Sequence, residues 1–148
     1  VFGETDAETN KKVAAAVRAG ITPMLCVGEK LEERESGKTL DVCLRQLRAG
    51  FEGIDAAHVA SAMVAYEPVW AIGTGKTATP ADAAEVHAAL RAELVKMVGE
   101  RGGAVPILYG GSVNRSNVEA LIAVEDVDGV LVGGASLDAE QWLAIARS

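Results

Sequence analysis

A glutamate stands directly after an apolar run of the chain, where a carboxylate could act as a general base. Glu67 follows residues 61–66, whose apolar character is typical of a buried strand, and Pro68 comes next. Proline cannot donate to a strand ladder, so the strand ends there. A carboxylate loses solvation at such a position, which favours either a catalytic base or a buried acid in a salt bridge. The position alone leaves both interpretations open.

The chain has three glycine-bearing turns. One lies in the loop after Glu67, and the other two follow predicted strands. Glycine lets the main chain approach a ligand closely, so N–H groups can hold an anion without a cationic side chain. For any one of these turns, an ordinary tight turn is as good an explanation as anion binding. It is a poorer explanation for all three together. The turns are Gly73-Thr74-Gly75, Gly110-Gly111-Ser112 and Gly133-Gly134-Ala135-Ser136.

Two other glycine motifs resemble the tail of a nucleotide-binding P-loop. They are Gly75-Lys76-Thr77 and Gly37-Lys38-Thr39. A P-loop also has a glycine five residues before the glycine of this tail. This chain has Trp70 at that position before Gly75, and Glu32 before Gly37. Neither motif predicts a nucleotide site.

The histidines and cysteines lack the spacing of a metal or nucleophile site. His58 lies in a predicted polar loop and His87 in a predicted helix, each without a second ligand at metal-binding spacing, so no metal is expected. Cys26 and Cys43 are interpreted as reduced thiols, and Cys26 as a small core residue, because no histidine is near it in sequence.

The composition indicates one globular domain over residues 1–148. The chain has 49% hydrophobic residues, no run approaching the ~18 apolar residues of a membrane span, and no signal pattern, so a cytoplasmic location is expected. Its net charge of −7 argues against nucleic-acid partners. The first residue is Val1 instead of Met, which suggests that the chain starts within a longer protein.

Helices and strands are predicted to alternate strictly. Apolar runs predict strands over 22–28, 61–66, 105–109 and 129–132, and helical spacing predicts helices over 5–19, 39–49, 79–99, 114–122 and 138–146. The charged stretch 29–35 is expected to be solvated, and 69–78 to be a long loop. Alternation of this kind indicates an α/β fold with a parallel sheet. Four βα units after one helix are half of an eight-unit barrel, which takes about 250 residues.

Five blocks of the chain together resemble the triosephosphate isomerase family, in the family's order and spacing. The longest runs from Ala65 to Lys76 and contains Glu67-Pro68-Val69-Trp70. The other four are Phe2-Gly3-Glu4-Thr5, Leu25-Cys26-Val27-Gly28-Glu29, Leu108-Tyr109-Gly110-Gly111-Ser112-Val113 and Leu131-Val132-Gly133-Gly134-Ala135-Ser136-Leu137.

The resemblance implies a (βα)8 TIM barrel, with this chain as its C-terminal half, and assigns roles to particular residues. Glu67 would be the base, and Gly73, Ser112, Gly133 and Gly134 would bind the substrate phosphate through main-chain N–H groups. A lid would close over the substrate. Its residues would be Pro68, Val69, Trp70, Ala71, Ile72, Gly73, Thr74, Gly75, Lys76, Thr77 and Ala78.

The implied reaction interconverts dihydroxyacetone phosphate and D-glyceraldehyde 3-phosphate through an enediolate, without cofactor or metal, in glycolysis and gluconeogenesis. The resemblance also implies a homodimer for the complete enzyme. The family's asparagine, lysine and electrophilic histidine would lie before Val1, so the isolated chain is expected to be inactive.

Two other functions remain open at this point. The chain could be a non-catalytic half-barrel that binds phosphorylated metabolites or pairs with a second half, because its sheet would have open edges. The other is another phosphate-binding barrel enzyme, such as a sugar-phosphate aldolase or a biosynthetic isomerase. It is disfavoured, since such an aldolase needs a Schiff-base lysine in a strand and every lysine falls in a predicted helix or loop.

Overall fold

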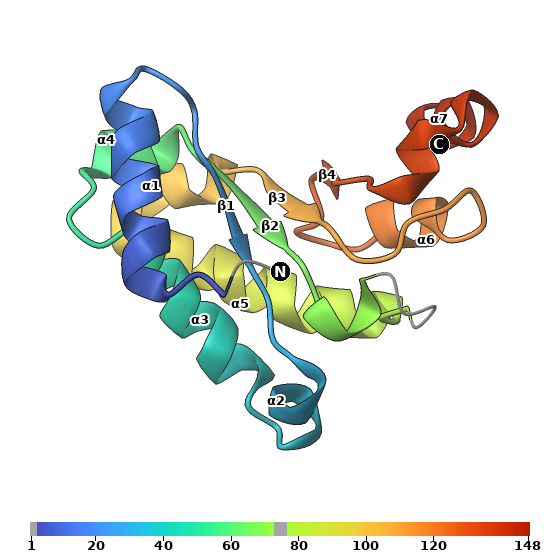
Figure 1. Ribbon diagram of the computed structural model, residues 1–148, viewed down its shortest axis with the longest axis horizontal. Helices are drawn as coiled ribbons and strands as arrows, with labels where there is room; N and C mark the ends of the chain where they lie inside the picture. The colour runs from blue at the N-terminus through green and yellow to red at the C-terminus, as the bar shows by residue number, and fades with distance from the viewer. Residues whose placement is uncertain (1–2, 73–76) are drawn as a thin grey trace.

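A computed structural model describes residues 3–72 and 77–148 as alternating helices and strands around one sheet (Figure 1). The strands are β1 (Met24–Val27), β2 (Met63–Tyr66), β3 (Ile107–Tyr109) and β4 (Gly129–Val130). The α-helices are α1 (Asp6–Arg18), α2 (Leu31–Glu35), α3 (Thr39–Gly50), α4 (Ala56–Ala60), α5 (Pro80–Val98), α6 (Val118–Ile122) and α7 (Ala139–Ala146). Short 3-10 turns are η1 (Val69–Ala71), η2 (Gly99–Ala104) and η3 (Gly134–Leu137). The predicted α/β alternation is confirmed.

The four strands form one parallel sheet in the order β1-β2-β3-β4. Met24 pairs with Met63, and Val64 with Ile107, so the strands run in step. Since all four strands point the same way, their carboxyl ends meet at one edge of the sheet. The residues that follow the strands, among them Glu29 and Glu67, are therefore brought together there.

Helices α3 and α5 cover one face of this sheet. In Figure 1 they run beneath the strands, while α1 lies at the end of the molecule opposite α6 and α7. Leu47 on α3 and both Leu90 and Leu94 on α5 are fully buried, as are Val64 and Ile107 in the sheet. Burying each such side chain contributes about 1.5–3 kcal/mol to stability. The packing of α3 and α5 on this face therefore holds the strands, and the residues at their ends, in place.

Two helices begin at the residues that the sequence predicts. Thr5 and Glu8 form a capping box at α1, with Glu8 Oε2 accepting from Thr5 N at 2.8 Å. Thr79 caps α5 in the same way, with Pro80 as its first residue. Side chains at these positions satisfy N–H groups that have no partner inside the helix. The start of α5 thereby fixes where the segment after Glu67 ends.

Two short helices were missed. Residues 29–35 are not all solvated: Glu29 is fully buried, and Leu31–Glu35 is helix α2. His58 lies in helix α4 instead of a loop, with Asp55 as its N-cap. Five-residue helices are too short to show a hydrophobic period, so the sequence pattern did not indicate them. Within the segment predicted as one loop over 69–78, residues Val69–Ala71 form a 3-10 turn.

The last predicted strand and the helix before it are shorter than expected. Strand β4 covers Gly129–Val130 instead of 129–132, and α6 covers Val118–Ile122 instead of 114–122. Strand β4 is an edge strand with β3 as its one neighbour in the described chain, so pairing ends early. Asn114 lies in a turn in which its N–H donates to Asn117 Oδ1 at 2.8 Å, and this turn delays the helix.

Arg91 on α5 holds the connection into β4. Its Nε donates to Asp126 Oδ1 at 3.0 Å and its Nη2 to Asp128 Oδ2 at 2.6 Å, while Nη1 donates to the Val105 carbonyl. Asp128 in turn accepts from the Ile107 N–H at 2.7 Å. One side chain therefore ties α5 to the start of both β3 and β4.

Replacing Arg91 with Met is expected to lower the free energy of unfolding by roughly 2–3 kcal/mol, because the partly buried Asp126 carboxylate and Val105 carbonyl lose a charged donor. Thermal unfolding of the two proteins measures this difference. The exposed Arg115 provides a control, since its replacement with Met should stay within about 0.5 kcal/mol. Equal unfolding midpoints for all three proteins would show that the Arg91 contacts do not stabilise the sheet.

No helix within residues 3–72 and 77–148 is both long and apolar enough to cross a membrane.

Candidate active site

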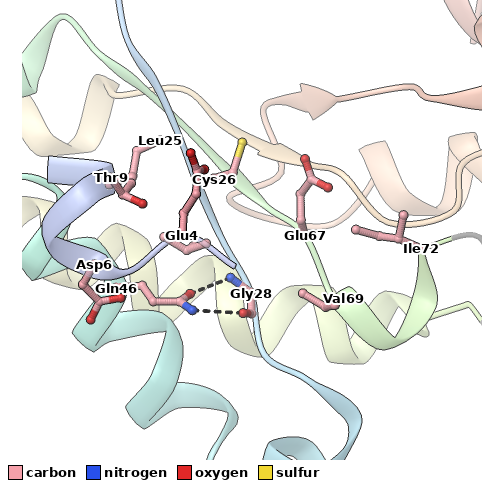
Figure 2. A pocket seen from close by; sticks show the side chains of 11 residues that line it. Glu4, Asp6, Thr9, Leu25, Cys26, Gly28, Gln46, Glu67, Val69 and Ile72 are labelled. Carbon is pink, nitrogen blue, oxygen red and sulfur yellow. Dashed lines mark hydrogen bonds between the residues drawn. The ribbon is translucent and has the colours of Figure 1, made fainter. Parts of the chain in front are cut away.

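A pocket of about 360 Å³ opens at the carboxyl end of β1 and β2 (Figure 2). Its size suits a small metabolite, since ligand pockets span roughly 300–1,000 Å³. Polar and apolar residues line it, from α1 and the residues just before it, from β1 and the residue just after it, from α3, and from the segment after β2. They are Glu4, Asp6, Thr9, Leu25, Cys26, Val27, Gly28, Gln46, Glu67, Val69 and Ile72.

Glu67 comes directly after β2 and lines this pocket from the strand end. Its N–H donates to the Val27 carbonyl at 2.7 Å, which fixes its main chain against β1. The side chain is half-buried, and burial raises the pKa of its carboxyl above the ordinary value; a hydrogen bond with the Cys26 thiol acts in the opposite direction. Among the described residues Glu67 forms no ion pair. Such a carboxylate can take up a proton more readily than a solvated one.

Cys26 is exposed toward the pocket, so its prediction as a core residue is wrong. Along β1, Leu25 and Val27 are buried while Cys26 between them is exposed, as the period of a strand requires when one face is covered. Although the residue is exposed, its thiol loses part of its solvation beside Glu67, and this desolvation and the negative charge of Glu67 raise the pKa of the Cys26 thiol to about 11. The thiol is therefore protonated at neutral pH and is a poor nucleophile.

Two glycines, Gly28 and Gly110, contact Glu67 so closely that neither position has room for a Cβ. A Cβ on Gly28 would lie 1.7 Å from the main-chain oxygen of Glu67, and one on Gly110 would lie 2.6 Å from Glu67 Cγ. Both distances are shorter than any stable contact between heavy atoms. These positions exclude every side chain larger than hydrogen because the main chain and side chain of Glu67 occupy the volume.

Glu29 forms a second acidic centre that the sequence interpretation missed. Its carboxylate is fully buried and accepts from Trp70 Nε1 at 2.8 Å, from the Tyr66 hydroxyl at 3.2 Å and from Arg34 Nη1 at 3.3 Å. Tyr66 and Trp70 flank Glu67 on both sides in the chain. The signal was present: Glu29 comes one glycine after an apolar strand, much as Glu67 follows its own.

Arg34 extends this centre to the far side of the segment after Glu67. Its guanidinium lies 4.8 Å from the centre of the Trp70 ring and pairs with Asp82 in the first turn of α5. Burial and the neighbouring Glu29 raise the pKa of the Cys43 thiol to about 12. Glu29 and Arg34 together anchor the chain before and after residues 73–76.

Of the residues predicted to bind phosphate, Ser112, Gly133 and Gly134 lie in the described ranges and do not line this pocket. Ser112 Oγ donates to the Ala71 carbonyl at 2.8 Å, which connects the turn after β3 to the segment after Glu67. Gly133 and Gly134 are exposed after β4, with open space where a Cβ would lie. Gly73, Thr74, Gly75 and Lys76 lie outside the described residues.

No group of three or more histidine, cysteine or acidic side chains in the described ranges is arranged to hold a metal ion. His58 Nδ1 contacts Asp55 at 2.5 Å, and His87 Nδ1 contacts the Asp126 carbonyl at 3.0 Å. Burial lowers the pKa of His87, so its imidazole is neutral at pH 7. Neither histidine lines the pocket that Glu67 lines, and His87 packs against the ring of Tyr66.

The whole chain is similar to one family of enzymes. The family model described as "Triosephosphate isomerase" matches residues 1–148. A protein of that name from Moorella thermoacetica is 56% identical over 146 residues, covering 99% of this chain and 59% of the relative. Relatives of the same name from Pseudomonas putida (strain GB-1) and Trichlorobacter lovleyi are each 52% identical, over 148 and 147 residues. The chain spans 59% of the length of each of these curated relatives.

Proposed function

Because the chain belongs to the triosephosphate isomerase family, whose members fold as TIM barrels, we propose that it is the C-terminal half of a barrel in which Glu67 is the catalytic base. The four parallel strands with alternating helices are then four of its βα units. The observation that carries the proposal is the half-buried Glu67 carboxylate, which faces a pocket without an ion-pair partner among the described residues.

In the proposed reaction Glu67 takes a proton from C1 of dihydroxyacetone phosphate, and the carbonyl oxygen at C2 gains the charge of an enediolate. A proton then passes from the C1 hydroxyl to the oxygen at C2, and the proton held by Glu67 returns at C2, which gives the C1 aldehyde of D-glyceraldehyde 3-phosphate. Partial burial supports this role because a poorly solvated carboxylate is a stronger base toward carbon. No cofactor or metal takes part in these steps.

The substrate phosphate is proposed to bind main-chain N–H groups of Gly73, Ser112, Gly133 and Gly134. Residues 68–78 are proposed to close over it as a lid that keeps water from the enediolate. Main-chain N–H groups can hold a dianion without cationic side chains, so a chain with a net charge of −7 can still bind the phosphate. The bond from Ser112 to Ala71 supports the placement of the turn after β3 near the start of that lid.

The remaining catalytic groups are proposed to come from the part of the relatives that this chain does not match. An asparagine, a lysine and a histidine there would polarise the carbonyl, and each missing stabiliser of a developing oxyanion costs about 10²–10³ in rate. The complete protein is proposed to be a cytoplasmic homodimer acting in glycolysis and gluconeogenesis.

The test compares the 148-residue chain with a complete barrel, made by joining this chain to the part of the Moorella thermoacetica relative that it does not match. Isomerisation of D-glyceraldehyde 3-phosphate is followed by a coupled assay. The complete barrel should turn over substrate, and the chain alone should be slower by at least about 10²-fold. Equal rates would contradict the proposal that essential groups lie outside this chain.

A second function is favoured by one observation, the open edges of the sheet. Within the described chain β1 pairs with β2 alone and β4 with β3 alone. A non-catalytic half-barrel would pair through these edges with a second half. Size-exclusion chromatography of the chain distinguishes the two, because a sharp compact peak supports the half-barrel and broad aggregates support a part of a larger enzyme.

A further inference from the structure

The amide of Gln46 on α3 grips the main chain of Gly28 with both of its polar atoms. The Gly28 N–H donates to Gln46 Oε1 at 2.8 Å, and Gln46 Nε2 donates to the Gly28 carbonyl at 3.2 Å (Figure 2). Gly28 comes just after the last residue of β1. The side chain of Gln46 thus takes the place of a neighbouring strand for this one residue.

Gly28 is also the residue against which the main chain of Glu67 rests. A Cβ on Gly28 would meet the Glu67 carbonyl oxygen at 1.7 Å and its carbon at 2.5 Å. On either side of this contact, the Glu67 N–H donates to Val27 and the Val69 N–H donates to the Glu29 carbonyl at 3.1 Å. The main chain around Glu67 therefore packs against residues 27–29 and is hydrogen-bonded to them.

Because residue 28 is a glycine, its main-chain conformation depends on contacts with other parts of the chain. Without a Cβ, glycine has more backbone conformations to choose from than any other residue. Among the described residues, Gln46 is the one hydrogen-bond partner of the Gly28 N–H and carbonyl, so an apolar side chain at position 46 would leave both groups without a partner there. Gln46 is held firmly, because Cys43 and Leu47 on the same helix are fully buried.

We infer that Gln46 is a positioning residue for the proposed base: it fixes Gly28, and Gly28 fixes the main chain of Glu67. The inference rests on the proposed function of Glu67. Gln46 acts through the main chain and transfers no proton itself. Its loss should therefore change the rate of the chemical step far more than the binding of substrate.

The test replaces Gln46 with Met in the complete barrel, which keeps the side-chain length and removes both hydrogen bonds. We expect kcat to fall by about 10- to 100-fold with KM changed less than about twofold, because small misplacements of a reacting group carry such a penalty. Gln46→Asn, whose amide is one methylene too short to span both groups, should show the same pattern and covers the case in which the Met variant fails to fold.

Asn10 provides a matched control. Its amide also holds main-chain groups, donating to the carbonyls of Gly50 at 3.1 Å and Glu52 at 2.8 Å, but it does so away from Glu67. Asn10→Leu should lower the unfolding temperature about as much as Gln46→Met and leave kcat unchanged. That contrast separates positioning from a general loss of stability.

Two results would overturn the inference. One is a kcat within twofold of the unmodified barrel in both Gln46 variants. The other is a parallel loss of kcat in Asn10→Leu, which would show that stability alone sets the rate. Either result, obtained while Glu67→Gln still lowers kcat by at least about 10²-fold, would leave the proposed function standing and remove Gln46 from it.

Discussion

Replacing Glu67 with Gln in the complete barrel should lower kcat by roughly 10²–10⁴-fold, which is the usual contribution of a general base. The amide keeps the shape of the side chain and its place in the pocket, but it cannot accept a proton from carbon. Because the phosphate is proposed to bind other residues, KM should change little. Steady-state rates across a range of substrate concentrations measure both quantities.

A carboxylate elsewhere in the chain provides the control for this substitution. Glu93 on α5 is buried and accepts from Arg48 Nε at 2.6 Å, and this bond lowers its pKa, whereas burial raises the pKa of Glu67. Glu93→Gln should therefore cost stability and leave kcat unchanged. If Glu67→Gln kept its rate while Glu93→Gln lost stability, Glu67 would be a structural acid as well.

Replacing Gly28 with Ala should have the second-largest effect, a fall in kcat of about 10²-fold. The new Cβ would lie 1.7 Å from the Glu67 carbonyl oxygen, which is main chain and cannot rotate away. The strand end must move instead, and a shift of about 1 Å at a reacting group costs about that factor. Overpacking should also lower the free energy of unfolding by about 1–3 kcal/mol. Rate assays and thermal unfolding measure the two effects.

Gly103 in η2 is the matched position for this test. A Cβ there would meet nothing within 4 Å, so Gly103→Ala should leave both the rate and the stability close to those of the unmodified protein. Wild-type kcat in Gly28→Ala would show that the contact with the Glu67 main chain does not set the position of the base.

The sequence was sufficient to place Glu67, because the signals that matter there are local. An apolar run, a carboxylate and a proline in succession predict a strand end with an acid on it, and β2 ends at Tyr66 as expected. The alternation of strands and helices could be predicted for the same reason. Strands of a parallel sheet are apolar throughout, and the helices between them are capped by recognisable residues such as Thr5 and Thr79.

The surroundings of Glu67 could not be predicted, because they depend on residues far apart in the chain. Glu29 is buried because Arg34, Tyr66 and Trp70 all donate hydrogen bonds to its carboxylate. No local sequence pattern indicates that these residues contact one another. Cys26 is exposed because helices cover the other face of β1. Short helices such as α2 were not predicted for a different reason, because five residues are too few to show a helical period.

The most direct test of the role of Glu67 follows hydrogen exchange at carbon. Dihydroxyacetone phosphate is incubated in D2O with the complete barrel or with its Glu67→Gln variant, and proton NMR records the signal at C1. We expect the unmodified barrel to replace hydrogen with deuterium at C1 as it turns over, since a proton held by the base exchanges with solvent, and the variant to exchange at least about 10²-fold more slowly. Equal deuterium incorporation by the two proteins would contradict the assignment of Glu67 as the base.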